Sequence, residues 1–513
     1  MIFIFGKTYT ATLHGIDGLL VQVESDISDG LPNFELVGIP SSEVREAKER
    51  VNTAFKNAQI KIPPKRITVN LSPADIRKCG SGFDLPIAIS ILCALGLLSR
   101  EILNKILICG ELGLDGKIKP IDGILSFVLC AKEYGLSYCM IPKDNEEEGC
   151  SIHGMKMIPV SSLSDVVEIL KHPDSIDEYA ISAKAWQEMH PILEPELSYD
   201  FSDIKGQEVL KRALEIAACG MHNVLMSGPP GSGKTMAAKR FPSILPPMTQ
   251  EESIEVTRIY SVCGLLPSRS GLMHMRPFRS PHHTISTQAL IGGGYYPQPG
   301  EVSLADRGVL FLDELTEFSN TTLETLRQPL EDGNVQISRV RGCYTFPSHT
   351  LLCAAMNPCK CGYYPDLNRC TCSLTDVKRY LAKLSKPFLD RIDITVETTA
   401  LNYQEFTSDA KSETSAKIRE RVLRIHKIQK ERYKDSNTFF NAQMNTHEIE
   451  KFCILDEKEE KLLEQLVATY KITARGYHKI LRVARTIADL EGNEKINEEH
   501  LMEAFCYRNS WLQ

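Results

Sequence analysis

The feature that most constrains the fold is a glycine-rich segment that matches the pattern G-x-x-x-x-G-K-S/T at every position. It follows an apolar run, Asn223–Met226, that favours a strand, and it leads into Met236–Arg240, which favours a helix. A strand, a glycine-rich turn and a helix in this order predict a phosphate-binding loop. The loop consists of Gly228, Pro229, Pro230, Gly231, Ser232, Gly233, Lys234 and Thr235.

The residues of this loop suit a nucleoside triphosphate. Glycines allow backbone N–H groups to turn inward around an anion, and the N-terminus of the following helix adds the positive end of its dipole. We expect Lys234 to reach the β- and γ-phosphates of ATP, and the Thr235 hydroxyl to bind the accompanying Mg²⁺. The alternative is an accidental glycine-rich turn, which the flanking strand and helix disfavour.

Two acidic residues follow a second apolar segment, which starts at Gly308 and ends at Leu312. A buried parallel strand of this kind delivers carboxylates to the edge of the sheet where phosphates bind. We expect Asp313 to hold Mg²⁺, directly or through water, and Glu314 to act as the general base for the attacking water. The alternative is an acidic end to a core strand without a catalytic role.

Three further polar residues are candidates for the same site. The apolar strand Thr350–Met356 ends in Asn357, whose amide would lie between the acidic strand and the phosphates and orient water. Arg391 precedes another apolar strand, where it is poorly placed for its own nucleotide but well placed for that of a neighbouring subunit. Arg475 begins a later helix and is a second candidate for the γ-phosphate. A lone arginine is more often a surface ion-pair partner, and that alternative stays open for both.

Four cysteines form two C-x-C pairs separated by eight residues: Cys359, Cys361, Cys370 and Cys372. The chain has sixteen cysteines and no secretory signal, so we expect a reducing, cytoplasmic environment in which clustered thiols bind metal before they form disulfides. Four thiolates suit a tetrahedral structural Zn²⁺ site, and reduced surface thiols are the alternative. The pair His282 and His283 could also bind metal, but hydrogen-bonded structural histidines are the more common case.

The segment Asn334–Phe346 predicts a β-hairpin with Arg339 and Arg341 near its tip. Arginines so placed suit contacts to the phosphates of DNA, whereas packing against another subunit is an equally weighted alternative. The formal net charge is −7, so the chain has no global basic field, and DNA binding would depend on local patches or on assembly. The longest apolar run, Ile87–Leu98, is too short to cross a membrane.

A length of 513 residues predicts about three domains. In the first of these, expected over residues 1–170, strand-like runs alternate with a well-signalled helix at Ser42–Asn57, which indicates an α/β fold. Gly110–Gly123 resembles a stretch of Lon-type protease domains. The Ser-Lys dyad of that family is missing, because residues 82–88 contain no serine and Leu125 stands where the lysine would be. The resemblance therefore implies the Lon-like (ribosomal S5 domain 2-like) fold without proteolysis.

The ordered set of phosphate loop, acidic strand, asparagine-terminated strand, Leu-Asp-Arg and Ala-Arg-Gly resembles the AAA+ ATPases. Several other segments look like the magnesium-chelatase-like branch of these ATPases, and within it the ComM/YifB family. The segments are Gly30–Pro40, Phe83–Pro86, Arg279–Ser286, Ile291–Gly294, Pro299–Ser303, Arg327–Gly333 and Ala354–Cys359. Asp306 is a small departure, since the family pattern has His there.

The resemblance implies an α/β AAA+ core over residues 203–400, with the cysteine insertion at 359–372 and a helical lid over 401–513. A linker over 171–202, with a short helix around Ala180–Met189, would join this core to the Lon-like domain. The family further implies a homo-hexameric ring and ATP-driven movement on DNA, namely helicase or branch-migration activity in recombination during natural transformation. Two alternatives stay open: a motor for insertion of Mg²⁺ into a porphyrin, and a protein-remodelling ATPase.

Overall fold

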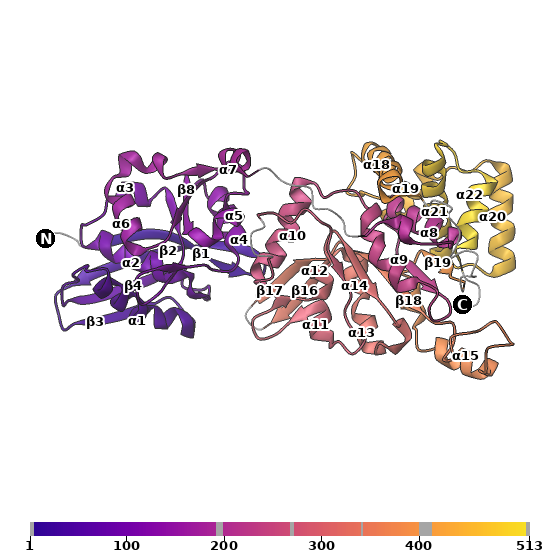
Figure 1. Cartoon of the computed structure of the whole chain (residues 1–513), viewed down its shortest axis with the longest axis horizontal. Helices are drawn as coiled ribbons and strands as arrows, with labels where there is room; N and C mark the ends of the chain where they lie inside the picture. Colours follow the sequence, from indigo (N-terminus) through magenta and orange to yellow (C-terminus); the bar gives the residue numbers. More distant parts are fainter. Residues whose placement is uncertain (1–4, 191–198, 267–270, 340–341, 400–412, 509–513) are drawn as a thin grey trace. The chain divides into compact units, whose positions relative to one another are not determined.

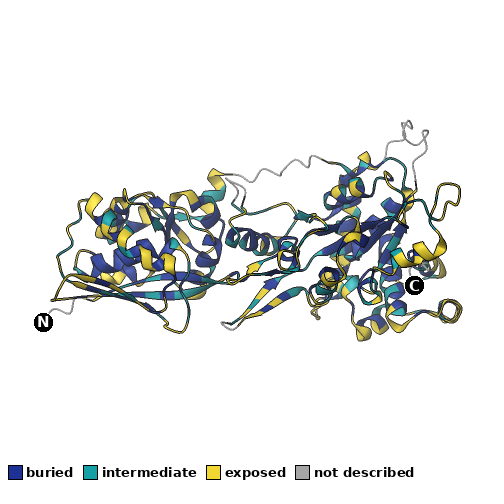
Figure 2. Ribbon diagram, turned by 90° about the horizontal axis from the view of Figure 1, so that it is seen from below, coloured by how far each residue is buried: buried dark blue, intermediate teal, exposed yellow. Residues whose placement is uncertain are grey.

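The computed structural model describes residues 5–190, 199–266, 271–339, 342–399 and 413–508. These residues divide into two compact units, one made of residues 1–194 and 250–273, the other of residues 195–249 and 274–513 (Figure 1). In both units the buried residues line the strands and the inner faces of the helices (Figure 2). Among the described helices, none is both long enough and apolar enough to cross a bilayer.

The first unit is built on one mixed eight-stranded sheet. Its strands are, from edge to edge, β10 (Ile181–Ser182), β9 (Lys156–Val160), β8 (Tyr138–Pro142), β5 (Ile106–Ile108), β1 (Phe5–His14), β2 (Asp17–Ser28), β4 (Arg66–Ser72) and β3 (Asn33–Val37). A small ribbon of β6 (Glu111–Leu112) and β7 (Ile118–Lys119) accompanies it. Residues 1–4 lie outside the described residues, and β1 begins at Phe5.

Helices cover this sheet because their apolar faces need a partner surface. The predicted helix at Ser42–Asn57 is confirmed as α1, and the Ser41 hydroxyl caps it by accepting a hydrogen bond from the backbone N–H of Val44. Residues 171–190 continue the unit, and the short helix predicted there is α7. The helices of the unit are α1 (Ser42–Asn57), α2 (Asp84–Ala94), α3 (Arg100–Leu103), α4 (Ile124–Glu133), α5 (Glu146–Gly149), α6 (Leu163–Lys171), α7 (Ala183–Met189) and α10 (Gln250–Val262).

Helix α10 belongs to this first unit although it lies far along the sequence. Its Arg258 guanidinium contacts the Asp17 carboxylate at 2.6 Å and donates to the backbone carbonyl of Ile16 at 3.1 Å. Its Ser261 hydroxyl donates to the carboxylate of Glu148, a residue of α5. Charged and buried polar contacts thus attach α10 to the turn between β1 and β2 and to α5.

The second unit contains a five-stranded parallel sheet. Its order is β12 (Phe278–Arg279), β15 (Val309–Leu312), β18 (Leu351–Met356), β11 (Val224–Ser227) and β19 (Ile394–Glu397). Every residue of β15, β18 and β11 is buried, as expected for central parallel strands with helices on both faces. The continuous apolar runs seen in the sequence are therefore these strands.

Helices and two ribbons complete the second unit (Figure 1). Those of the core are α8 (Glu208–Gly220), α9 (Lys234–Arg240), α11 (Thr287–Ile291), α12 (Glu301–Leu304), α13 (Asn320–Thr325), α14 (Arg327–Asp332), α15 (Leu374–Leu381) and α16 (Lys386–Leu389). The C-terminal helices are α18 (Ser415–Arg432), α19 (Thr446–Phe452), α20 (Glu457–Tyr470), α21 (Ala474–Glu491) and α22 (Glu498–Cys506). The ribbons pair β13 (Gly292–Gly293) with β14 (Gln298–Pro299) and β16 (Asn334–Arg339) with β17 (Gly342–Pro347).

Candidate nucleotide-binding site

The order of the parallel sheet brings the predicted site residues to one edge. Strand β18 lies between β15 and β11, with Leu312 paired to Ala354 and Ser227 paired to Met356. The carboxyl ends of these three strands run into the acidic pair, into Asn357 and into the glycine-rich loop. This arrangement confirms that the asparagine-terminated strand lies between the acidic strand and the loop.

The glycines of the loop occupy positions that other residues would strain. Gly231 and Gly233 have φ angles of 77° and 88°, in the left-handed region. A Cβ at Gly228 would lie 2.1 Å from the Thr398 hydroxyl oxygen, because the loop packs tightly against the segment after β19. Glycine-rich loops with left-handed residues suit phosphate, because they can turn backbone N–H groups toward an anion.

The Lys234 ammonium lies folded into this loop. It donates to the carbonyl oxygens of Gly228 and Pro229 at 2.7 and 2.9 Å, and it lies 3.4 Å from the amide oxygen of Asn357. Burial lowers the pKa of Lys234, and the Asp313 carboxylate offsets only part of this effect. A buried ammonium whose charge is only partly compensated favours an anion beside it, so the loop fits the phosphates of a nucleotide.

Thr235 and the acidic strand supply hard oxygen ligands at the same edge. The Thr235 hydroxyl donates to Asp313 Oδ2 at 2.7 Å, and the backbone N–H of Glu314 donates to Asp313 Oδ1 at 2.9 Å. Hydroxyl and carboxylate oxygens are the protein ligands that Mg²⁺ prefers in nucleotide sites. The residues present therefore fit Mg-ATP, with Thr235 and Asp313 on the metal side. The Glu314 side chain is 59% exposed, so its carboxylate is open to water.

The two candidate arginines lie close to one short segment but differ in exposure. The Arg391 side chain is only 7% exposed, forms an ion pair with Glu331, and donates to the carbonyl of Pro387 at 3.1 Å. The Arg475 side chain is 63% exposed, and its Nη1 lies 3.9 Å from Asp390 Oδ2. The Arg475 side chain thus lies mostly in solvent, whereas the Arg391 guanidinium is buried in its ion pair with Glu331.

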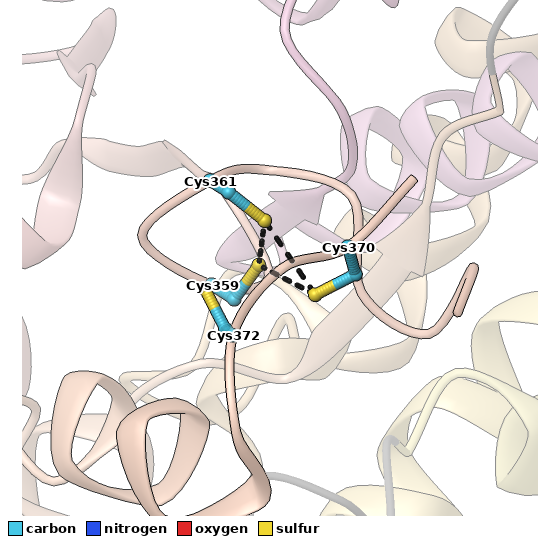
Figure 3. Close-up of side chains that lie close together, drawn as sticks. All are labelled: Cys359, Cys361, Cys370 and Cys372. Carbon is cyan, nitrogen blue, oxygen red and sulfur yellow. Dashed lines mark hydrogen bonds between the residues drawn. The ribbon is translucent and has the colours of Figure 1, made fainter. Parts of the chain in front are cut away.

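The four cysteine thiols converge in the loop between β18 and α15 (Figure 3). Their sulfurs all lie within 4.8 Å of one another, and the Cys359–Cys361, Cys361–Cys370 and Cys359–Cys370 separations are 3.3, 3.5 and 3.7 Å. Zn–S bonds of about 2.3 Å in a tetrahedron place sulfurs about 3.8 Å apart. The pKa of the Cys361 thiol is lowered to about 6, mainly because its sulfur accepts a hydrogen bond from the backbone N–H of Tyr363. The geometry therefore fits a four-thiolate Zn²⁺ site.

We expect the purified chain to contain about one zinc per polypeptide, because four protein thiolates complete a structural site. Cys361→Ser should lower the zinc content at least about tenfold, as the loss of one thiolate weakens binding steeply. Elemental analysis after gel filtration measures this. Cys343→Ser is the matched control, since Cys343 is an exposed cysteine in β17 outside the cluster. A wild-type zinc content near zero would contradict the site.

The predicted hairpin is confirmed as β16 and β17, paired in antiparallel register from Asn334↔Pro347 to Arg339↔Gly342. Arg339 is exposed, and its Nε donates to the carbonyl oxygen of Gly294 at 3.3 Å. Arg341, the second predicted DNA contact, lies outside the described residues. The Arg339 side chain is therefore exposed at the described end of the hairpin and contacts the backbone of Gly294.

The first unit carries no sign of the Lon dyad at the matching positions. Leu125, which stands in place of the lysine, is fully buried in α4. Asp84, at the start of α2, is also fully buried, and its carboxylate pairs with the Arg50 guanidinium at 2.6 Å. Apolar packing and a buried ion pair thus occupy the region where the protease family has its nucleophile and activating amine.

One residue near Glu314 was not predicted to take part in the site. The Nδ1 atom of His283 lies 3.2 Å from Glu314 Oε2. The available signal was a pair of histidines soon after the short strand β12, which runs parallel to β15 and ends at the same edge of the sheet. The sequence does not show that β12 and β15 are neighbours. From the sequence alone, a histidine beside Glu314 therefore could not be distinguished from an ordinary structural histidine.

Comparisons with known proteins agree with this architecture. The family model described as "Magnesium chelatase, subunit ChlI" matches residues 200–406. "Subunit ChlI of Mg-chelatase" matches residues 23–145, and "Magnesium chelatase, subunit ChlI C-terminal" matches residues 412–508.

Full-length relatives extend the similarity over almost the whole chain. Competence protein ComM of Haemophilus influenzae is 42% identical over 503 residues, which cover 98% of this chain and 96% of that protein. The uncharacterized protein YifB of Escherichia coli is 39% identical over 502 residues, with the same coverage. Lon protease of Azospirillum brasilense is 30% identical over 170 residues, 31% of this chain and 20% of that protease.

The parallel sheet, the phosphate-binding loop and the matched models define a magnesium-chelatase-type AAA ATPase with a Lon-like N-terminal domain and a helical C-terminal domain. This class of domain implies ATP hydrolysis. Within it, the chain belongs to the ComM/YifB family.

Proposed function

We propose that this chain assembles into a homo-hexameric ring and couples ATP hydrolysis to movement on DNA, as a branch-migration or helicase motor in recombination during natural transformation. In this proposal Lys234 binds the phosphates, Thr235 and Asp313 hold Mg²⁺, and Glu314 takes the proton of the attacking water. Asn357 orients that water, Arg475 approaches the γ-phosphate within the chain, and Arg391 reaches the nucleotide of the neighbouring subunit.

The observation that carries the DNA part of the proposal is the hairpin. Its Arg339 is exposed at the last residue of β16, and a ring would repeat this arginine at each subunit. Phosphate contacts by arginine do not depend on base sequence, which suits a motor that moves along DNA. The relative from Haemophilus influenzae is named a competence protein, and this name supports a DNA-related role here.

Two arginines of α18 are less suited to bind DNA, because they form ion pairs with carboxylates of their own chain. Arg421 pairs with Glu215 and Glu413 at 2.6 Å, and Arg432 pairs with Asp489 at 2.5 Å. This basic helix therefore stabilises the packing of the C-terminal helices, and the hairpin remains the better candidate.

Steady-state ATPase assays with single-stranded and branched DNA at several salt concentrations test the proposal. We expect DNA to raise the rate, and we expect the apparent affinity for DNA to fall as salt rises, because binding releases counterions. Arg339→Ala should weaken DNA binding and lower the salt slope by about one for each phosphate that the arginine no longer neutralises.

Arg379→Ala is the matched control for the hairpin variant. Arg379 is an exposed arginine of α15, with a side chain 79% accessible, and it lies outside the hairpin. This variant should bind DNA like the wild type. The DNA role would be refuted if DNA did not stimulate hydrolysis and salt did not weaken DNA binding. The remaining candidates would then be a motor for metal insertion into a porphyrin and a protein-remodelling ATPase.

A further inference from the structure

The four cysteines belong to a segment that has very little apolar core of its own. Residues 357–373, all of which the structure describes, form no helix or strand between β18 and α15. Residues 365–369 are all exposed, and Leu367 has 80% of its surface in solvent. A segment that buries so little apolar surface does not keep one conformation by packing alone. A metal ion bound to the four thiols is therefore what can fix its shape.

The same segment packs directly on the phosphate-binding loop. A Cβ at Gly362 would lie 2.5 Å from Cδ and 2.9 Å from Cγ of Pro230, so no side chain fits between these two residues. Gly362 has a φ angle of 86°, and its backbone N–H donates to the carbonyl of Cys359 at 3.0 Å. The turn that contacts Pro230 thus runs from Cys359 through Cys361 and contains two of the four thiols.

Both ends of the segment are attached to the nucleotide-binding edge of the sheet. The segment begins at Asn357, whose amide oxygen lies 3.4 Å from the Lys234 ammonium. Its other end leads into α15, where the Tyr380 hydroxyl accepts a hydrogen bond from the Thr316 hydroxyl at 2.5 Å, two residues after Glu314. The segment and α15 therefore contact the residues that follow each of the three central strands, β18, β11 and β15.

Contacts that do not involve the cysteines hold the other side of the phosphate-binding loop. The Ser232 hydroxyl lies 2.7 Å from that of Thr398, and the side-chain amide of Gln207 donates to the Ser232 carbonyl at 3.3 Å. The tip of the loop, residues 229–231, is exposed or only half-buried. This tip is the part on which Gly362 packs, so the cysteine segment supports the loop where ordinary packing is weakest.

We propose that the four-cysteine segment, held in shape by Zn²⁺, positions the phosphate-binding loop, so that the affinity for Mg-ATP depends on occupancy of the thiol site. The inference rests on the proposed phosphate-binding role of Lys234 and its loop. Without the metal, the tip of the loop must become ordered when the nucleotide binds. Fixing the backbone of one residue costs about as much free energy as a tenfold change in affinity, so we expect Kd for Mg-ATP to rise about tenfold or more.

Equilibrium binding of a fluorescent ATP analogue to the full-length chain tests this inference, with zinc content measured on the same samples. In excess Mg²⁺, a nitrogen chelator that prefers zinc should raise Kd about tenfold, and added Zn²⁺ should restore it. Cys361→Ser should raise Kd to a similar extent. Cys343→Ser should keep both the Kd and the zinc content of the wild type, because Cys343 lies outside the cluster.

Gly362→Ala tests the contact between the segment and the loop. The added methyl group would displace Pro230 while all four thiols remain, so we expect Kd to rise with about one zinc still bound per chain. Gly492→Ala is the matched control, because Gly492 also has a positive φ angle, 79°, but a Cβ there would have nothing within 4 Å. This variant should bind the analogue like the wild type.

The inference would be overturned by a wild-type chain that holds no zinc, by an unchanged Kd after zinc removal, or by equal effects of Gly362→Ala and Gly492→Ala. Lys234→Ala separates this failure from failure of the proposed site. If Lys234→Ala does not bind the analogue and zinc-free wild type binds it fully, only the positioning role is rejected. If Lys234→Ala binds it with the wild-type Kd, the role of the phosphate-binding loop itself is rejected.

Discussion

Replacement of Glu314 by glutamine is expected to lower kcat for ATP hydrolysis by about 10²- to 10⁴-fold, the range associated with loss of a general base. Glutamine has nearly the same shape but cannot accept a proton from water at neutral pH. Binding of ATP should persist, because the Lys234 ammonium and the glycine-rich loop are unchanged. The measurement is steady-state phosphate release, together with equilibrium binding of a fluorescent ATP analogue.

Lys234→Ala should differ from Glu314→Gln in the binding assay. It removes the cation that the loop surrounds, so we expect both nucleotide binding and hydrolysis to be abolished. Glu317→Gln is the matched control for Glu314→Gln. Glu317 lies three positions after Glu314, is 47% exposed and pairs with Lys383. Hydrolysis at the wild-type rate by Glu314→Gln or Lys234→Ala would contradict the assignment of the site.

Replacement of Arg391 by alanine is expected to lower kcat by about 10³-fold or more, as for other arginines that act on a neighbour's γ-phosphate. In the structure this side chain is buried and paired with Glu331. The role across a subunit boundary therefore requires the guanidinium to leave Glu331. Steady-state hydrolysis at saturating ATP measures the effect, and gel filtration establishes whether the variant elutes like the wild type.

Arg391→Lys is the companion variant. It keeps a positive charge beside Glu331 but loses the planar fork that contacts two phosphate oxygens at once. We expect it to fold and assemble normally while remaining strongly impaired in hydrolysis. A wild-type rate in either variant would remove Arg391 from the catalytic set.

The nucleotide-binding edge could be predicted from sequence because its signals are local. The glycine-rich loop, the acidic pair after Leu312 and the asparagine after Met356 each follow a continuous apolar run, and such runs are typical of buried parallel strands. The shared geometry of parallel strands then brings these ends together. The four cysteines of the cluster also lie close together in the sequence, and the structure confirms that their thiols converge.

Two features of the first unit were beyond sequence reasoning for different physical reasons. In β1 the buried positions include Thr8, Thr10 and Thr12, so the strand lacks an apolar alternation; the Thr8 hydroxyl, for example, donates to the carbonyl of Pro86. Helix α10 packs on residues that precede it by more than fifty positions, through contacts such as that of Arg258 with Asp17. Hydrophobic periodicity reports which face is buried, but not which surface covers it.

The contact between His283 and Glu314 likewise could not be predicted from sequence patterns. Each residue lies in a recognisable segment, yet the pairing depends on the adjacency of β12 and β15. Sequence patterns do not indicate the place of β12 in the sheet, because this strand is only two residues long. The pairing of a short strand with a partner far away in the sequence is therefore visible only in the structure.

We propose that a neighbouring subunit completes each nucleotide site, and an assay that mixes two inactive variants decides this. Lys234→Ala chains keep Arg391, whereas Arg391→Ala chains keep the phosphate-binding loop. When the two are mixed and reassembled in equal amounts, about one quarter of the interfaces join an intact loop to an intact arginine, and hydrolysis should recover to about that fraction of the wild-type rate. A mixed rate equal to the mean of the two inactive parents at every mixing ratio would contradict a shared site.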